Sequence, residues 1–369
     1  CLVPVPLGSV VRDADTGEEL VDLTQPGQRF LAARGGAGGL GNRHFATATD
    51  RAPRRATPGQ DGETRWLSIE LKMLADVGLI GLPNAGKSTL TNAMVGTKIA
   101  ITSGRPQTTR HNVRGVIHKE NAQIVLVDTP GLHRPRTLLG KRLNDLVRET
   151  LADVDVVVFC IPANEKIGPG DRFITRDLAE LRTPVVAVVT KADTVTREAL
   201  AAQLLAVSEL GEWADIVPVS AQRNEQIDVL EEVLLKYMPL SPPLYPTGEI
   251  TDEPQQVMIA ELVREAALEG VRDELPHSLA VQVEEIIERP RREGDDRPPM
   301  LDIHVNVYVE RDSQKAIIIG RKGSRLKQIG TQARAHIEEL LGRRVYLDLH
   351  VRTAKDWQSD PKMLGRLGF

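Results

Sequence analysis

The octapeptide Gly81-Leu82-Pro83-Asn84-Ala85-Gly86-Lys87-Ser88 constrains the fold of this chain more than any other segment. It fits the pattern GxxxxGK(S/T), follows the apolar run Val77–Ile80 and precedes a helical stretch that starts at Thr89. This order of strand, glycine-rich loop and helix is typical of a P-loop. Its backbone amides bind phosphates, Lys87 contacts the β- and γ-phosphates, and the Ser88 hydroxyl binds Mg²⁺. The predicted nucleotide-binding residues of the loop are Asn84, Ala85, Gly86, Lys87, Ser88 and Thr89.

Short apolar runs rich in β-branched residues alternate with helical stretches between residues 75 and 238. Continuous apolar strands separated by helices indicate a mostly parallel sheet that is covered on both faces. We therefore predict a doubly wound α/β domain over residues 75–238. Its predicted strands are Val77–Ile80, Ile124–Val127, Val154–Ile161, Val185–Val189 and Ile216–Val219.

The tetrapeptide Thr190-Lys191-Ala192-Asp193 follows one of these strands and faces the ligand crevice of such a sheet. The Asp193 carboxylate can accept two hydrogen bonds from guanine, whereas adenine would leave it unpaired. Lys191 would cover the base plane, and Ser220-Ala221 would present a backbone amide to guanine O6. Together with Thr190, these residues predict binding of GTP or GDP and disfavour the alternative of an ATP-dependent kinase or ATPase.

A magnesium site is predicted where Asp128-Thr129-Pro130-Gly131 closes the strand Ile124–Val127. Asp128 can enter the Mg²⁺ shell, and the Gly131 amide can contact the γ-phosphate. Leu132 stands where Ras-like switches carry the glutamine that orients water, so we expect slow intrinsic turnover.

The polar loop Gln107-Thr108-Thr109-Arg110 is the candidate for the threonine that senses the γ-phosphate. We favour Thr109, and Thr108 remains the alternative. Loss of the γ-phosphate would release the loop, which predicts an order-to-disorder switch. The predicted catalytic residues are Lys87, Thr109 and Gly131, and the predicted metal ligands are Ser88, Thr109 and Asp128.

Prolines recur over residues 239–255, which predicts an extended linker before a last domain at residues 256–369. This domain has the predicted order α-β-β-α-α-β and contains Gly320-Arg321-Lys322-Gly323, so it resembles a type II KH domain with its GXXG turn. Nine basic and three acidic residues lie between Arg311 and Arg344, a local charge of +6 in a chain of net charge −4. Such a local excess favours RNA binding. The predicted RNA-binding residues are Gly320, Arg321, Lys322, Gly323, Arg325 and Lys327.

From about residue 91 to the end, the chain resembles the Era family of bacterial ribosome-assembly GTPases. The resemblance implies 16S ribosomal RNA near its 3′ end and the small ribosomal subunit as partners, a role in small-subunit biogenesis, and a cytoplasmic location with peripheral membrane association as a further expectation. Related GTPases also suggest a potassium ion at Asn84. The motifs that carry the resemblance are Ile101–Ser103, Gln107–His111, Asp128–His133 and Leu364–Phe369.

The first 90 residues instead resemble the Obg GTPases. We expect residues 1–74 to be a partial Obg-like glycine-rich β segment, and Ala85 makes the P-loop Obg-like as well. Because the Obg glycine-rich domain is longer than this segment, we expect its glycine-rich stretches to lack partners. Because the segment has few large apolar residues, we expect it to fold poorly. Its arginines would give weak nonspecific RNA affinity. The quoted stretches are Val3–Pro6, Arg12–Gly17, Gly35–Asn42, Arg51–Pro53 and Leu74–Ser88.

The 369 residues suggest two or three domains. The two cysteines, Cys1 and Cys160, favour reduced thiols and a cytoplasmic address, and Cys160 lies in a run typical of a buried strand. No apolar stretch approaches the ~20 residues of a membrane span, and no leader is expected. Because the chain begins with Cys1, we expect it to be processed or a fragment. Two functions remain open: a GTPase switch, or an RNA-binding protein whose nucleotide site is only structural.

Overall fold

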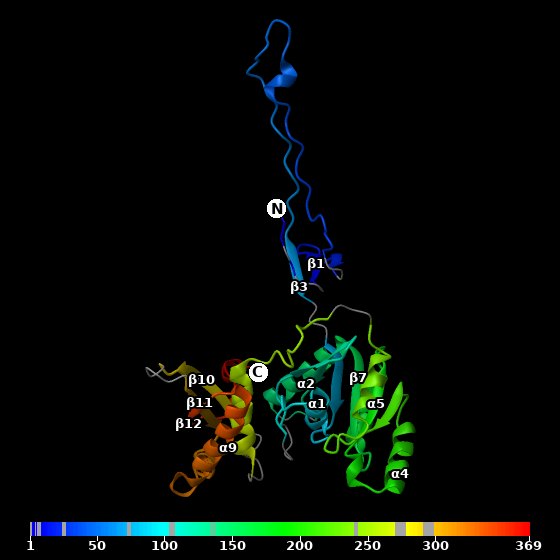
Figure 1. Cartoon of the computed structure of the whole chain (residues 1–369), viewed down its shortest axis with the longest axis vertical. Coiled ribbons are helices and arrows are strands. Elements are labelled where there is room, and N and C mark those ends of the chain that lie inside the picture. The colour runs from blue at the N-terminus through cyan, green and yellow to red at the C-terminus, as the bar shows by residue number, and fades with distance from the viewer. Residues whose placement is uncertain are drawn as a thin grey trace. The chain divides into compact units, whose positions relative to one another are not determined.

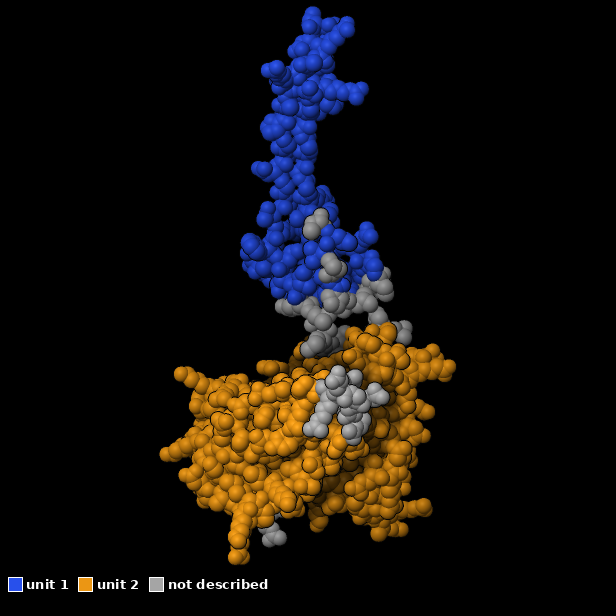
Figure 2. Space-filling model, turned by 60° about the vertical axis from the view of Figure 1, so that its left-hand side comes forward, with its two compact units in different colours: residues 1–74, 240–242 blue, residues 75–239, 243–369 orange. Residues whose placement is uncertain are grey.

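The computed structural model describes residues 2–3, 5, 9–23, 27–71, 75–102, 108–133, 135, 137–239, 243–269, 278–290 and 299–369. The chain divides into two units, which Figure 2 colours separately. The first contains residues 1–74 and 240–242, and the second contains residues 75–239 and 243–369.

The first unit contains a three-stranded antiparallel sheet in the order β2-β1-β3, formed by β1 (Ser9–Asp13), β2 (Glu19–Leu23) and β3 (Leu67–Leu71). A tight turn joins β1 to β2, in which Gly17 N donates to the Asp13 carbonyl at 2.8 Å. The Asp13 carboxylate also accepts from the amides of Asp15 and Thr16 within the turn.

Between β2 and β3 the chain runs out and returns as two long strands of extended backbone (Figure 1). Residues 34–40 pair with residues 57–63 through three backbone hydrogen bonds, and on each strand the bonded residues are three positions apart. The bonds run from Thr57 N to the Leu40 carbonyl, from Gln60 N to the Ala37 carbonyl and from Glu63 N to the Arg34 carbonyl. Three residues is the repeat of polyproline II. A Cβ on Gly36 would lie 1.8 Å from the Gln60 carbonyl oxygen, so the close pairing requires glycine. Our expectation that these stretches lack partners is wrong for the described residues.

The second unit begins with a six-stranded sheet in the order β5-β6-β4-β7-β8-β9. The five predicted strands are present, and all of them run parallel. The strand β5, which we did not predict, pairs antiparallel with β6 at the edge. The bounds are β4 (Ala75–Gly81), β5 (Val113–His118), β6 (Gln123–Asp128), β7 (Val154–Pro162), β8 (Val185–Thr190) and β9 (Asp215–Pro218).

Helices cover both faces of this sheet, as the continuous apolar strands predicted. Alternate residues of β7 separate into two cores: Val156 and Val158 pack with α1 and α5, whereas Val157 and Phe159 pack with α2, α3 and α4. Cys160 is buried as predicted, and burial raises the pKa of its thiol to about 12. The helices are α1 (Lys87–Val95), α2 (Leu138–Ala152), α3 (Pro169–Leu178), α4 (Arg197–Ser208) and α5 (Ile227–Leu235).

The described part of the linker is bound to the edge of the six-stranded sheet. Val116 N in β5 donates to the Ile250 carbonyl at 2.8 Å, and Arg114 forms an ion pair with Asp252 at 3.2 Å. The Gln123 side chain accepts hydrogen bonds from two further linker amides. Residues 244–252 therefore lie along the exposed edge of the sheet.

The last part of the unit has the predicted α-β-β-α-α-β order around the sheet β10-β11-β12. The strands β10 and β11 are antiparallel, and β11 and β12 are parallel. The first helix ends at Leu268, and residues 270–277 lie outside the described part of the chain. The elements are α6 (Gln255–Leu268), β10 (Ala280–Glu288), β11 (Leu301–Val309), α8 (Asp312–Ile319), α9 (Ser324–Leu341), β12 (Val345–Thr353) and α10 (Pro361–Arg366).

Candidate functional site

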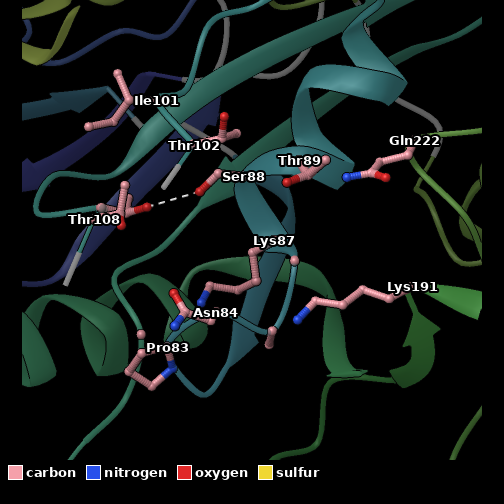
Figure 3. Close-up of a pocket in the computed structure, with 14 residues that line it drawn as sticks. Pro83, Asn84, Lys87, Ser88, Thr89, Ile101, Thr102, Thr108, Lys191 and Gln222 are labelled. Atoms are coloured by element: carbon pink, nitrogen blue, oxygen red, sulfur yellow. Dashed lines mark hydrogen bonds between the residues drawn. The ribbon is translucent and has the colours of Figure 1, made fainter. Parts of the chain in front are cut away.

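A cleft of about 350 Å³ opens where β4 passes through the P-loop into α1 (Figure 3). Gly86 immediately precedes α1 with φ +89°, a left-handed conformation in which glycine is favoured. Asn84 also has a positive φ, of 65°. All six predicted loop residues line the cleft, together with Pro83, Ile101, Thr102, Thr108, Thr109, Gly131, Lys191 and Gln222.

Lys87 is the first residue of α1, and its side chain is buried beneath the loop. Its Nζ lies 3.5 Å from the Gly81 carbonyl oxygen. Burial lowers the pKa of this ammonium, while Asp128 acts in the opposite direction. A buried cation at the floor of a phosphate loop gains most from an anion that replaces its lost hydration.

Three oxygen-bearing side chains meet next to Lys87. The Ser88 hydroxyl donates to Asp128 Oδ2 at 2.5 Å and lies 3.0 Å from Thr109 Oγ1, which is itself 3.4 Å from Asp128 Oδ2. Burial raises the pKa of Asp128, against the effect of Lys87. The buried Asp128 Oδ1 has no hydrogen-bond partner among the described residues. Hard oxygen donors with one unsatisfied carboxylate oxygen suit Mg²⁺.

The structure also separates the two threonines that sequence analysis left open. Thr109 presents its hydroxyl to Ser88 and Asp128, whereas Thr108 offers its backbone carbonyl to Arg264 of α6. Both residues line the cleft. Gln107 lies outside the described residues.

The predicted guanine-binding residues come together at the carboxyl ends of β8 and β9. Ser220 Oγ donates to Asp193 Oδ1 at 2.6 Å, and Thr190 Oγ1 donates to the P-loop carbonyl of Ala85 at 2.6 Å. Lys191 has a positive φ of 57° and lines the cleft. Its Nζ lies 3.5 Å from Glu165 Oε1. Ala221 follows Ser220 and is partly buried. The bond from Thr190 to Ala85 joins the guanine-binding loop to the P-loop.

Gly131 lines the cleft so close to Pro83 that a Cβ would lie 2.8 Å from the Pro83 nitrogen. The next side chain, Leu132, is 6% exposed and packs in the core with Ile80 and Val147. The described structure therefore directs no hydrogen-bonding group into the cleft from this position.

Sequence reasoning missed four lining residues: Pro83, Ile101, Thr102 and Gln222. Gln222 directly follows Ser220-Ala221, so an extension of that motif by one residue would have found it. Ile101 and Thr102 belong to a motif that we quoted without assigning it a role. Only their packing in three dimensions shows that they reach the cleft.

The GXXG turn joins α8 to α9. Arg321 and Lys322 are exposed at its tip, and a Cβ on Gly320 would lie 2.7 Å from the Cβ of Arg325. Lys327 is exposed one turn into α9. The Arg325 guanidinium, in contrast, donates to the Glu269 carbonyl at 2.7 Å, so it ties α9 to the end of α6. Arg325, which we predicted to contact RNA, therefore forms a hydrogen bond within the protein.

Comparison with known protein families gives matches to three successive parts of the chain. The GTP1/OBG family model matches residues 1–73, the 50S ribosome-binding GTPase model matches residues 76–191, and the KH domain model matches residues 274–358. A GTPase Era from Streptomyces coelicolor is 64% identical over 296 residues, which are 79% of this chain and 93% of that protein. A GTPase Era from Mycolicibacterium smegmatis is 61% identical over 296 residues, 79% of this chain and 97% of that protein.

Two solved structures are similar over the same share of the chain. One is a crystal structure of Era in complex with MgGDPNP and nucleotides 1506–1542 of 16S ribosomal RNA, with 38% identity and a TM-score of 0.74. The other is an Aquifex aeolicus Era variant bound to GDP·AlF4⁻, with 38% identity and a TM-score of 0.75. Each covers 80% of this chain and is itself covered to 98%. Within the described residues, no helix has both the length and the apolar character needed to cross a bilayer.

Proposed function

The chain belongs to the Era family of GTPases, and from this premise we propose that it is a GTP-binding and GTP-hydrolysing switch that acts in small ribosomal subunit biogenesis. The cluster of Ser88, Thr109 and Asp128 beside the buried Lys87 carries the proposal, because it combines phosphate binding with a set of metal ligands. The KH domain in the same chain would bind 16S ribosomal RNA near its 3′ end, as an Era relative does.

Each residue has a defined part in this proposal. The P-loop amides and Lys87 bind and orient the phosphates, Ser88, Thr109 and Asp128 hold Mg²⁺, and the Gly131 amide contacts the γ-phosphate. Bound Mg²⁺ would neutralise charge on the phosphate oxygens. Asp193 selects guanine, and Lys191 covers the base. Intrinsic turnover is slow, because the Leu132 side chain packs in the core and has no group that could orient the attacking water.

Arg321, Lys322 and Lys327, with the glycines of the turn, would form the RNA surface. They are exposed on adjoining turns, where a nucleic-acid backbone can approach the main chain. Arg325 would contribute by fixing the turn to α6 through its bond to Glu269.

Two finer assignments are also part of the proposal. Asn84 would coordinate a potassium ion through its amide oxygen, because it lines the cleft directly beside the phosphate-binding residues. A ribosomal partner supports a cytoplasmic location, and peripheral association with the inner face of the cell membrane follows from the family resemblance. Co-sedimentation with vesicles that contain anionic lipids tests the membrane assignment.

The alternative is an RNA-binding protein in which the nucleotide site is only structural. Multiple-turnover hydrolysis of GTP by the full chain, in Mg²⁺ and with and without RNA from the 3′ end of 16S ribosomal RNA, separates the two. Phosphate release that disappears in Thr109→Ala supports the GTPase. Tight GTP binding with no phosphate release above the protein-free rate would favour the alternative.

A further inference from the structure

The loop that carries Thr109 is fixed to the KH domain at both of its described ends. At its start, Glu265 Oε1 accepts a hydrogen bond from Thr102 N at 2.9 Å. At its end, the Arg264 guanidinium donates to the Thr108 carbonyl. Arg264 and Glu265 are consecutive residues of α6, and both are buried. Two neighbouring residues of a KH helix thus bind a loop of the GTPase domain.

Apolar and aromatic contacts add to these polar ones. Ile101 lines the nucleotide cleft and also belongs to the core formed by α6, where it packs with Ile259 and Leu262. Arg110 is buried, donates to the Leu279 carbonyl at 2.6 Å and lies 5.7 Å from the ring centre of Trp357. The residues on either side of Thr109 are therefore bound to the KH domain.

Thr109 itself presents its hydroxyl to the nucleotide site. Its Oγ1 lies 3.0 Å from Ser88 Oγ and 3.4 Å from Asp128 Oδ2. A small displacement of the flanking backbone would break these contacts, because a hydrogen bond weakens steeply beyond this range.

Both buried charges of α6 have counterions. Arg264 Nε donates to Glu261 Oε1 at 2.8 Å, and Lys98 Nζ donates to Glu265 Oε2 at 2.6 Å. Burial acts to raise the pKa of Glu261, but the Arg264 guanidinium, together with His111 and Arg110, outweighs this effect and the net shift is downward. The contacts to the loop are therefore charge-assisted and stronger than bonds between neutral groups.

We propose that Arg264 and Glu265 are positioning residues of the GTPase site, which place Thr109 against Ser88 and Asp128 and act through this threonine. The inference rests on the proposed GTPase function. It makes the preference for GTP over GDP, and the Mg²⁺ requirement of the GTP-bound form, dependent on a helix of the RNA-binding domain.

The test compares the full chain with the variants Glu265→Ala, Arg264→Gln and Thr109→Ala, and with the double variant Thr109→Ala plus Glu265→Ala. Gln256→Ala, at an exposed position of the same helix, is the matched control. For each protein we would measure the affinities for GDP and for a non-hydrolysable GTP analogue, both as a function of Mg²⁺ concentration. Single-turnover hydrolysis rates and thermal unfolding complete the set.

Glu265→Ala and Arg264→Gln should lower the ratio of analogue affinity to GDP affinity about tenfold, the size expected when one hydrogen bond to a charged group is lost. GDP affinity should stay within about twofold of the parent, and Gln256→Ala should match the parent throughout. The double variant should be no worse than Thr109→Ala alone, because residues that act through one another are non-additive. If Glu265→Ala does not fold, Glu265→Gln should show the same shift at about threefold.

Parent-like ratios in both single variants, or additive losses in the double variant, would overturn the inference. These measurements use analogue binding and need no hydrolysis, so they remain decisive if the parent chain releases no phosphate. A parent chain that releases no phosphate would count against the GTPase function and not against the positioning role of Arg264 and Glu265.

Discussion

Ser220 and Asp193 join two loops of the sheet through one short hydrogen bond, in which Ser220 Oγ donates to Asp193 Oδ1 at 2.6 Å. Ser220 is fully buried, and its own backbone pairs with Glu225 in both directions. The carboxylate is therefore held in orientation before a base arrives, which reduces the ordering cost of binding.

Asp193→Asn should change base selectivity and keep the contact between the loops, because Ser220 can also donate to an amide oxygen. We expect GTP affinity to fall by about 100-fold or more, and xanthosine triphosphate to become the better ligand, because the new amide donor suits the additional carbonyl of xanthine. Competition binding with the two nucleotides measures the change. Unchanged GTP affinity would refute the assignment of Asp193.

Asn84→Gly tests the potassium assignment at little cost to the loop, because glycine readily adopts the φ of 65° found at this position. If the Asn84 amide coordinates the ion, the parent chain should hydrolyse GTP faster in potassium than in sodium chloride at equal ionic strength. The variant should lose this difference and retain GTP affinity. Equal parent rates in the two salts would exclude the role.

Charge reversal at the GXXG turn should remove RNA binding and leave the nucleotide site intact. For Arg321→Glu with Lys322→Glu we expect loss of measurable binding to single-stranded RNA, and GDP affinity equal to that of the parent. Arg334→Glu with Arg344→Glu makes the same change in charge at exposed positions away from the turn and should weaken binding less.

The salt dependence gives an independent check of this surface. For single strands, the log–log slope of affinity against salt is about −0.7 for each phosphate contacted. Single reversal of Arg321 or Lys322 should reduce the slope by about 0.7. A parent affinity that does not respond to salt would point to a different RNA surface.

Truncation should distinguish the first unit from the nucleotide site. Deletion of residues 1–72 should leave GTP affinity within a few-fold, because it preserves β4. Deletion of residues 1–81 should abolish binding, since β4 pairs with both β6 and β7 and leads into the P-loop. Calorimetric titration with GDP compares the two proteins. Insolubility of the shorter deletion would show that the first unit is integral to the fold.

Asp76 predicts a pH dependence of stability. Burial raises its pKa to about 6, although it accepts a hydrogen bond from Val125 N. The folded state keeps this proton between about pH 4 and 6, where the unfolded chain releases it, so Asp76 makes stability fall as pH rises through this window. Above pH 6 the cost is constant, on the order of 3 kcal/mol.

Asp76→Asn should therefore raise the free energy of unfolding at pH 8 by the same amount, on the order of 3 kcal/mol, and should have little effect at pH 4. Urea unfolding at both pH values measures it. An equal effect at the two pH values would show that ionisation is not the cause.

The sequence predicted those parts of the site whose conformation is set locally. The P-loop and Thr190–Asp193 follow apolar strands and carry their chemistry within a few residues, so pattern and spacing were sufficient. The strand β5 was missed because Arg114 and Gly115 interrupt its apolar pattern. Its hydrogen bonds to the linker and to β6 supply what its own composition lacks.

Long-range contacts were beyond reach for a different reason. Arg264 and Thr108 are 156 residues apart, and Glu265 and Thr102 are 163 apart. Nothing near either residue in the sequence distinguishes these side chains from the other charged residues of an amphipathic helix. The pairing of residues 34–40 with 57–63 likewise joins two segments that are separated in the sequence, through hydrogen bonds that recur every three residues.

The cover that the linker gives to β5 has a consequence for synthesis of the protein. His118 Nε2 contacts the Glu249 carbonyl at 2.7 Å, and the two residues are 131 positions apart in the chain. At about 5–20 residues per second, the ribosome needs on the order of ten seconds to make that stretch. During this interval the edge of the nascent sheet is open to pairing with other chains. Slower translation of residues 119–250 would lengthen that exposure.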